Sequence, residues 1–191
     1  MRLLLTFIVV CSLGVSISAL ATSVPDNFTP EGVYSWAMKE LKSAENLEDR
    51  FYALTQVSIS TFEVGKIEDA RSYAEELLSM APSFQSNWNY GNAIHKGNIV
   101  LGRIALLNDD IYKANEYLRR AGETPGSPQL NSFGPNMTLA KELLEKSETE
   151  SVKKYLLQCE NFWEMDRDKL EFWTFQIDKG KIPDFGANLL Y

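Results

Sequence analysis

The chain has 191 residues, of which 45% are hydrophobic, and its 26 acidic and 19 basic residues give a net charge of −7. This acidic balance makes nucleic acid and anionic lipid poor partners. Because the chain has one histidine and only two cysteines, at positions 11 and 159, it offers no His-rich metal site, and no disulfide can form within residues 22–191.

The first 21 residues have the features of a secretory signal peptide. One arginine precedes an apolar run over residues 3–13, and small residues then lead to Ala21, where we expect cleavage. An uncleaved anchor and a lipoprotein are the weaker alternatives, because the run is short for a membrane span and Val10 is an unsuitable residue before a lipidated Cys11. We therefore predict a periplasmic or secreted protein without a stable membrane span after cleavage. Loss of Arg2 lowers its net charge from −7 to −8, and a flexible segment over 22–28 comes first.

A leading helix is predicted to begin after Thr29, because threonine is a good N-cap and Pro30 then occupies the first helical position. Its apolar residues recur at helical spacing and should pack on the element that follows. They are Val33, Trp36, Ala37 and Leu41.

Three later stretches of the chain repeat one pattern. A small residue at Ser58, Gly102 and Ala140 is followed twelve positions later by Ala70, Ala114 and Val152, respectively. Spacings of three and four then place further residues on one helical stripe in each unit. These stripe residues are Tyr73, Ala74 and Leu77, then Tyr117, Leu118 and Ala121, then Tyr155, Leu156 and Cys159.

Each repeat is predicted to be an αα-hairpin. Two antiparallel helices approach closely only where one of them presents a small side chain, which is the role we expect for Gly102. Gly65, residues 108–110 and residues 147–149 are suited to the turn between the two helices of each unit.

Residues 166–179 are predicted to form a closing helix with two apolar faces. Leu170, Trp173 and Ile177 share one face, whereas Phe172 and Phe175 point to the opposite side. The first face should pack on the third hairpin. The two phenylalanines then require another cover.

The tail over residues 180–191 is the predicted cover. Gly180 ends the helix, Pro183 directs an extended return, and Gly186 permits a bend before three apolar residues, Leu189, Leu190 and Tyr191. We expect this tail to pack on the closing helix over Phe172 and Phe175. The alternative is docking into a partner or a second copy of the chain, which makes self-association conceivable.

The hairpins resemble the tetratricopeptide repeat (TPR) family. The second unit matches best, with Leu101, Gly102, Ala105, Ala114, Leu118, Ala121 and Pro125. The resemblance covers roughly residues 48–163, but the unit spacings of 44 and 38 residues exceed the family period of about 34. It implies an all-α, TPR-like αα-hairpin solenoid over residues 29–179, with about three degenerate units, irregular linkers and a capping helix at each end.

The resemblance also implies a ligand groove lined by the first helix of each unit. Transferred to this chain, the groove positions are Tyr52, Thr55, Ile59 and Phe62, then Lys96, Ile99, Arg103 and Leu106, then Met137, Lys141 and Leu144. Lys96, Arg103 and Lys141 are similar to the clamp with which some TPR domains hold the terminal carboxylate of a peptide. Alternatively, these long cations only extend from amphipathic helices into solvent.

No catalytic constellation is evident. His95 is the only histidine and is expected to be structural or exposed, and Cys159 falls at a packing position where a small buried thiol is expected. We therefore predict a non-catalytic scaffold or adaptor of the cell envelope that binds a protein or peptide without a cofactor or metal. The alternatives are an enzyme acting on an envelope polymer in a helical cleft and a structural subunit whose groove is filled by its own chain.

Overall fold

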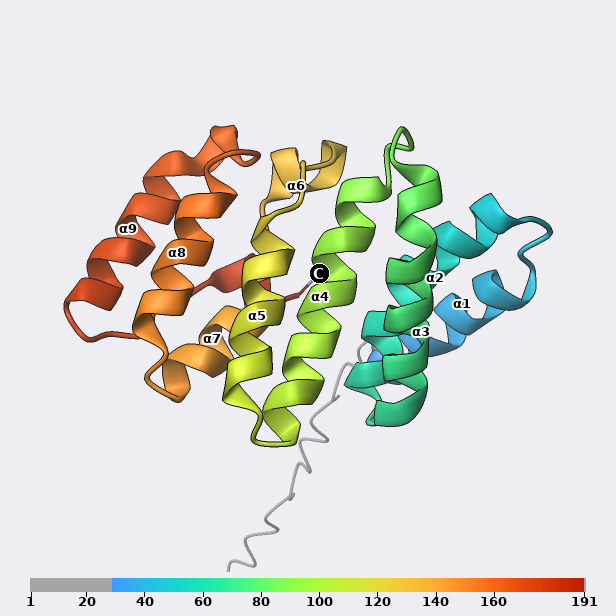
Figure 1. Ribbon diagram of the computed structural model, residues 1–191, viewed down its shortest axis with the longest axis horizontal. Coiled ribbons are helices and arrows are strands. Elements are labelled where there is room, and N and C mark those ends of the chain that lie inside the picture. Colours follow the sequence, from blue (N-terminus) through green and yellow to red (C-terminus); the bar gives the residue numbers. More distant parts are fainter. Residues whose placement is uncertain (1–28, 191) are drawn as a thin grey trace, which may run out of the picture.

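Helices make up all of the regular secondary structure in the computed structural model, which describes residues 29–190 (Figure 1). Within this range nine α-helices follow one another, and the all-α class predicted from the sequence is confirmed. They are α1 (Pro30–Lys42), α2 (Leu47–Glu63), α3 (Ile67–Met80), α4 (Tyr90–Leu107), α5 (Ile111–Gly122), α6 (Pro128–Phe133), α7 (Thr138–Glu145), α8 (Thr149–Cys159) and α9 (Arg167–Asp178). The predicted signal peptide (1–21) and the segment over 22–28 lie outside the described residues.

Helix α1 begins where its sequence predicts. The Thr29 hydroxyl accepts a hydrogen bond from the backbone amide of Gly32 at 3.1 Å. Ala37 and Leu41 are buried in the core shared with α2. Trp36, expected on the same stripe, is instead 55% exposed, because α2 is the principal neighbour of α1 and covers only a narrow part of its surface.

The three predicted hairpins correspond to the pairs α2–α3, α4–α5 and α7–α8, whose members contact each other. The first helices of successive pairs also meet, since α4 contacts both α2 and α7. A Cβ atom added to Gly102 on α4 would lie only 2.2 Å from Cδ2 of Leu139 on α7 and 3.1 Å from Cβ of Tyr117 on α5. Glycine is therefore required where α4 meets these two helices.

The turns inside the three hairpins have the same backbone conformation. Gly65, Asp109 and Ser147 all have positive φ angles, of 76°, 55° and 68°, and are separated by the unit spacings of 44 and 38 residues. The amide of the next residue bonds back to the last turn of the preceding helix in each case: Lys66 to the Thr61 carbonyl (3.1 Å), Asp110 to Ala105 (2.9 Å) and Glu148 to Leu143 (3.0 Å). This is the Schellman pattern of helix termination, used three times.

The linkers between hairpins contain more helix than the sequence analysis predicted. A short 3₁₀ helix (Ala81–Phe84) precedes α4, and α6 lies within the segment 122–135 that was expected to be an irregular loop. The signals for α6 are local: the Ser127 hydroxyl accepts from the Leu130 amide at 3.0 Å, a proline follows it, and Gly134 ends the helix with a φ of 85°.

The tail packs on its own chain, but on a different face of α9 from the one predicted. Leu170, Trp173 and Ile177 are buried, whereas Phe172 and Phe175 remain 55% and 57% exposed, so the predicted cover over these two phenylalanines is wrong. Phe185 of the tail instead packs against the Trp173 ring, with centroids 4.9 Å apart. The Trp173 face leads into the largest core cluster, where Phe185 can be almost fully buried.

Asn188 anchors the tail to the linker between α6 and α7. Its side-chain amide donates to the carbonyls of Pro135 (2.9 Å) and Phe133 (3.1 Å), and its own carbonyl accepts from the Met137 amide (2.8 Å). Asn188 is 2% exposed, so these buried bonds hold the tail in one place. In Figure 1 the red tail passes behind α8 and α5 and ends beside α4.

The shared turn conformation predicts a stabilising substitution. Ser147→Gly should raise the free energy of unfolding by about 0.5 to 1 kcal/mol, because glycine adopts a positive φ without the Cβ clash that serine suffers. For a chain of this size the thermal midpoint should rise by about 1 to 4 °C.

Ser72→Gly is the matched control, since Ser72 is an exposed residue inside α3. There the same exchange should destabilise by about 0.5 kcal/mol, because glycine is a poor helix former. A midpoint lowered by both substitutions would contradict the assignment of the Ser147 turn.

Candidate functional site

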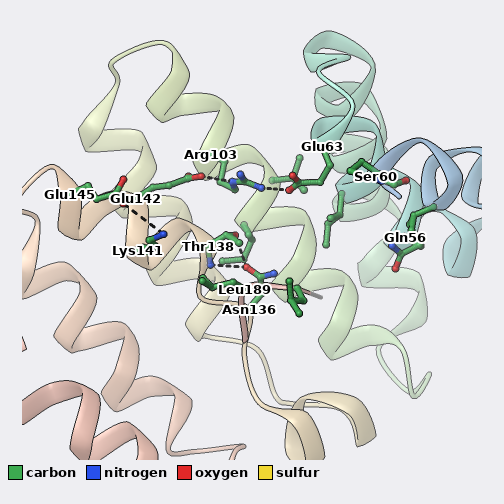
Figure 2. A pocket seen from close by; sticks show the side chains of 16 residues that line it. Gln56, Ser60, Glu63, Arg103, Asn136, Thr138, Lys141, Glu142, Glu145 and Leu189 are labelled. Carbon is green, nitrogen blue, oxygen red and sulfur yellow. Dashed lines mark hydrogen bonds and ion pairs between the residues drawn. The ribbon is translucent and has the colours of Figure 1, made fainter. Parts of the chain in front are cut away.

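A groove of about 570 Å³ crosses the first helices of the three hairpins, with α1 at one side and the tail at the other. Figure 2 shows how α2, α4, α7 and the tail surround it. Its apolar side chains are Pro30, Val33, Ile59, Ile99, Val100, Leu189 and Leu190. Its charged side chains are Glu63, Arg103, Lys141, Glu142 and Glu145.

Arg103 is the central charged group of the groove. Its guanidinium forms an ion pair with Glu63 of α2, donates from Nε to Glu142 of α7 at 2.8 Å, and lies 4.3 Å from the centroid of the Phe62 ring. Figure 2 shows Arg103 lying between the two carboxylates. The side chain is only 15% exposed, so these partners compensate a charge that burial would otherwise penalise.

The other charges of the groove are more weakly held. Burial raises the pKa of Glu142, and the nearby Arg103 guanidinium only partly opposes this effect. Lys141 lies 4.0 Å from Glu145, and both side chains are about half exposed, so this ion pair contributes little. The five charged residues leave the groove with a net charge of −1.

The predicted groove residues do not all lie in the groove. Four of them line it, namely Ile59, Ile99, Arg103 and Lys141. Tyr52 instead lines a neighbouring pocket with Trp36 and Asp49, and Lys96 lines a third pocket beside α6. Thr55, Phe62, Leu106, Met137 and Leu144 are buried or half-buried in the interior.

The three cations of the predicted carboxylate clamp are therefore not gathered in one pocket. Lys96 and Arg103 are two helical turns apart on α4, and the pockets that they line share only Asn136. Arg103 already has two carboxylate partners within its own chain. Of the two cations that line the groove, Lys141 is held more loosely than Arg103.

The position of α7 depends on His95, which is buried in α4. His95 donates from Nδ1 to the Ala121 carbonyl at 3.1 Å and accepts at Nε2 from the Asn136 amide at 3.0 Å. The Asn136 carbonyl in turn accepts from the Tyr155 hydroxyl at 2.9 Å. The linker before α7 is thus attached to α4 and α8. His95 was expected to be structural or exposed. It is structural, because it is buried and both ring nitrogens are hydrogen-bonded.

Several residues that shape the groove were not found from the sequence. Asn136, Glu63, Glu142 and Asn188 had no motif that marked them as groove residues. The only available signal was charge, since Glu63, Arg103 and Glu142 all lie on the first helices of the predicted hairpins. Asn188 carried no comparable signal.

The described residues contain little that resembles catalytic machinery. No group of three or more His, Cys, Asp or Glu side chains within residues 29–190 could hold a metal ion. Burial raises the pKa of the Cys159 thiol far above its usual range, which removes it as a thiolate nucleophile. None of the helices over this range has the length and apolar character needed to cross a bilayer.

Comparison with known proteins found no match. No family model, curated protein or solved structure resembles this chain significantly. The groove must therefore be interpreted from its own geometry.

The environment of His95 predicts a specific pH dependence of stability. Desolvation lowers its pKa from 6.5 to about 4, although the bond to the Ala121 carbonyl opposes the change. Above pH 6.5 the ring is neutral in the folded and unfolded chains alike. Between pH 6.5 and 4 only the unfolded chain takes up the proton, so the free energy of unfolding should fall as the pH is lowered, by about 2 to 3 kcal/mol at pH 4.5.

His95→Gln provides the comparison, because glutamine retains a donor and an acceptor but does not titrate. Urea unfolding at pH 7 and pH 4.5 should show that the parent loses about 2 to 3 kcal/mol more than the variant. The carboxylates common to both proteins cancel in this difference. Equal losses would mean that His95 is protonated in the folded protein.

Proposed function

We propose that this protein is a non-catalytic scaffold or adaptor of the cell envelope that binds a protein segment or peptide in the groove across α2, α4 and α7. The observation that carries the proposal is the composition of the groove. Apolar side chains from four elements line it together with charged groups from α2, α4 and α7. An extended peptide fits such a surface, because its side chains bury apolar area while its backbone and charges bond to the polar groups.

A TPR-like arrangement of hairpins supports this proposal. The equivalent turns, the glycine at the contact of α4 with α7, and the contacts between successive first helices are what stacked αα-hairpins require. The enlarged unit spacings are accommodated by the 3₁₀ helix before α4 and by α6, both of which lie between hairpins. The likeness to TPR proteins rests on this internal repetition alone.

The charges of the groove narrow the chemistry of the peptide. A terminal carboxylate would have to displace Glu63 or Glu142 from Arg103, whereas Lys141 is available at the cost of a weak ion pair. Basic side chains would meet the carboxylates of Glu63 and Glu145, both of which are about half exposed. We therefore propose a peptide with apolar and basic residues, whose terminal carboxylate, if it is bound here, pairs with Lys141.

Export by the predicted signal peptide completes the proposal. The intact mass of the protein recovered from its native compartment should correspond to a chain that begins at Thr22, because small residues precede this position as signal peptidases require. A mass that retains residues 1–21 would contradict cleavage and favour a membrane anchor.

Peptide selection provides the direct test of the groove. Peptides enriched from a random displayed library against residues 22–191 should bind Val33→Lys at least about tenfold more weakly than the parent, since the new charge enters the apolar wall of the groove. Leu157→Lys is the control, because Leu157 is 64% exposed on α8 and does not line the groove.

Binding of the selected peptides that survives Val33→Lys, or that is lost only with Leu157→Lys, would place the binding surface elsewhere. Circular dichroism of both variants would show that each remains folded.

One observation favours a second candidate, a structural subunit with a self-filled groove. Leu189 and Leu190 of the tail form part of the groove wall, and Asn188 fixes them there. If the tail occupies the binding surface permanently, selection against the full mature chain should enrich no peptide. This result would favour the structural role over the peptide-binding role.

A further inference from the structure

The third pocket, which Lys96 lines, has a volume of about 330 Å³ and lies between α4 and α6, apart from the groove. Leu130 and the ring of Phe133 give it an apolar wall, and Lys96 lies on its α4 side. The Phe133 side chain is 64% exposed. The pocket is predominantly apolar, yet it contains one cationic side chain.

Lys96 differs from the other lysines with similarly covered side chains. Lys96, Lys141 and Lys153 are half-buried, while the remaining lysines in residues 29–190 are exposed. Lys141 pairs with Glu145, and Lys153 pairs with Asp178 at 2.8 Å. No ion pair or hydrogen bond joins the Lys96 ammonium to any of the described residues.

None of the described residues that line the pocket neutralises this ammonium. Desolvation lowers the pKa of Lys96, which is the effect expected of an amine covered by apolar surface without a counter-charge. His95 is neutral, and its two nitrogens are engaged by Ala121 and Asn136. The Asn92 side chain is engaged as well, by Asn89, Gln129 and Ser127.

We propose that this pocket binds a carboxylate attached to an apolar body. The carboxylate pairs with Nζ of Lys96 and supplies a counter-charge that the described residues do not provide there. The apolar body packs against Leu130 and Phe133. Such a ligand is either a free acid, such as a medium-chain fatty acid, or the last residue of a peptide that ends in an apolar side chain. The proposal does not depend on the peptide groove.

Octanoate and octan-1-ol form the first pair of probes, because they share an alkyl chain and differ in charge. Calorimetric titration of residues 22–191 should show octanoate binding at least about tenfold more tightly than octan-1-ol, which is the effect of one charged hydrogen bond. Lys96→Met should abolish this preference while keeping an unbranched side chain of similar length. Lys153→Met, which removes a half-buried lysine outside both the groove and this pocket, should leave it unchanged.

The thermal midpoint provides a second readout that needs no detectable heat of binding. Without ligand, Lys96→Met should raise the midpoint, because it removes an unpaired ammonium from an apolar site. Octanoate should then raise the midpoint of the parent and of Lys153→Met, but not that of Lys96→Met. The proposal would be overturned if the parent and Lys96→Met preferred octanoate over octan-1-ol equally. It would also be overturned if the parent preferred neither octanoate nor the free carboxyl end of the peptide described below.

The source of the carboxylate is distinguished by a second pair of probes, an acetylated tripeptide that ends in leucine and the same peptide with a C-terminal amide. A preference for the free carboxyl end that exceeds the preference for octanoate, and that requires Lys96, identifies a peptide terminus. The reverse order identifies a free acid. If neither pair shows a Lys96-dependent preference for the carboxylate, the site does not exist. Val33→Lys should affect neither pair, which separates this result from the test of the groove.

Discussion

The position of the third hairpin relative to the second depends on the two hydrogen bonds of His95. They connect α4 to the end of α5 and to Asn136, so one buried ring sets where the chain leaves the second hairpin and enters the third. The position of α7, and with it one wall of the groove, follows from that attachment. The Asn136 amide can donate to Nε2 only while the imidazole is neutral. Protonation of His95 would therefore break the bond that positions α7 beside the groove.

The linker held by His95 is also held from its other side by the tail. Asn188 bonds to the carbonyls of Phe133 and Pro135 and to the Met137 amide. The segment 133–137 is therefore fixed by groups that lie about 40 and about 50 residues away in the chain, respectively. Its rigidity matters for function because this segment separates the groove from the Lys96 pocket and contributes to both.

The tail contributes to both the core and the groove. It completes the core by burying Phe185 against Trp173, and it also forms part of the groove wall. A partner in the groove would contact Leu189 and Leu190 as part of the binding surface, so the tail would act as a component of the site. In a self-filled groove the same residues would be its ligand. The exposed phenylalanines of α9 do not distinguish these roles, since the tail does not cover them.

The partners of Arg103 differ from the ligand that its predicted role implies. The TPR resemblance predicted a groove cation that binds a ligand's carboxylate. In the structure it joins α2 to α7 through Glu63 and Glu142. An arginine that holds three first helices together stabilises the groove, and a ligand that took one of its carboxylates away would pay the cost of leaving that group unpaired.

Local sequence patterns predicted the helices of the three hairpins, the turns within them and the close contact at Gly102. These follow from local rules: helical periodicity selects the buried face, and a position such as Gly65 terminates a helix wherever it occurs. The same rules would have identified α6 from Ser127 and Pro128 had they been applied to that linker. The partners of Arg103, the isolation of Lys96 and the face of α9 that receives the tail depend on the tertiary fold and could not be predicted from these rules. Periodicity says which side of a helix faces inward, but it cannot say which group about 40 residues away will lie opposite, because that depends on how several hairpins stack at once.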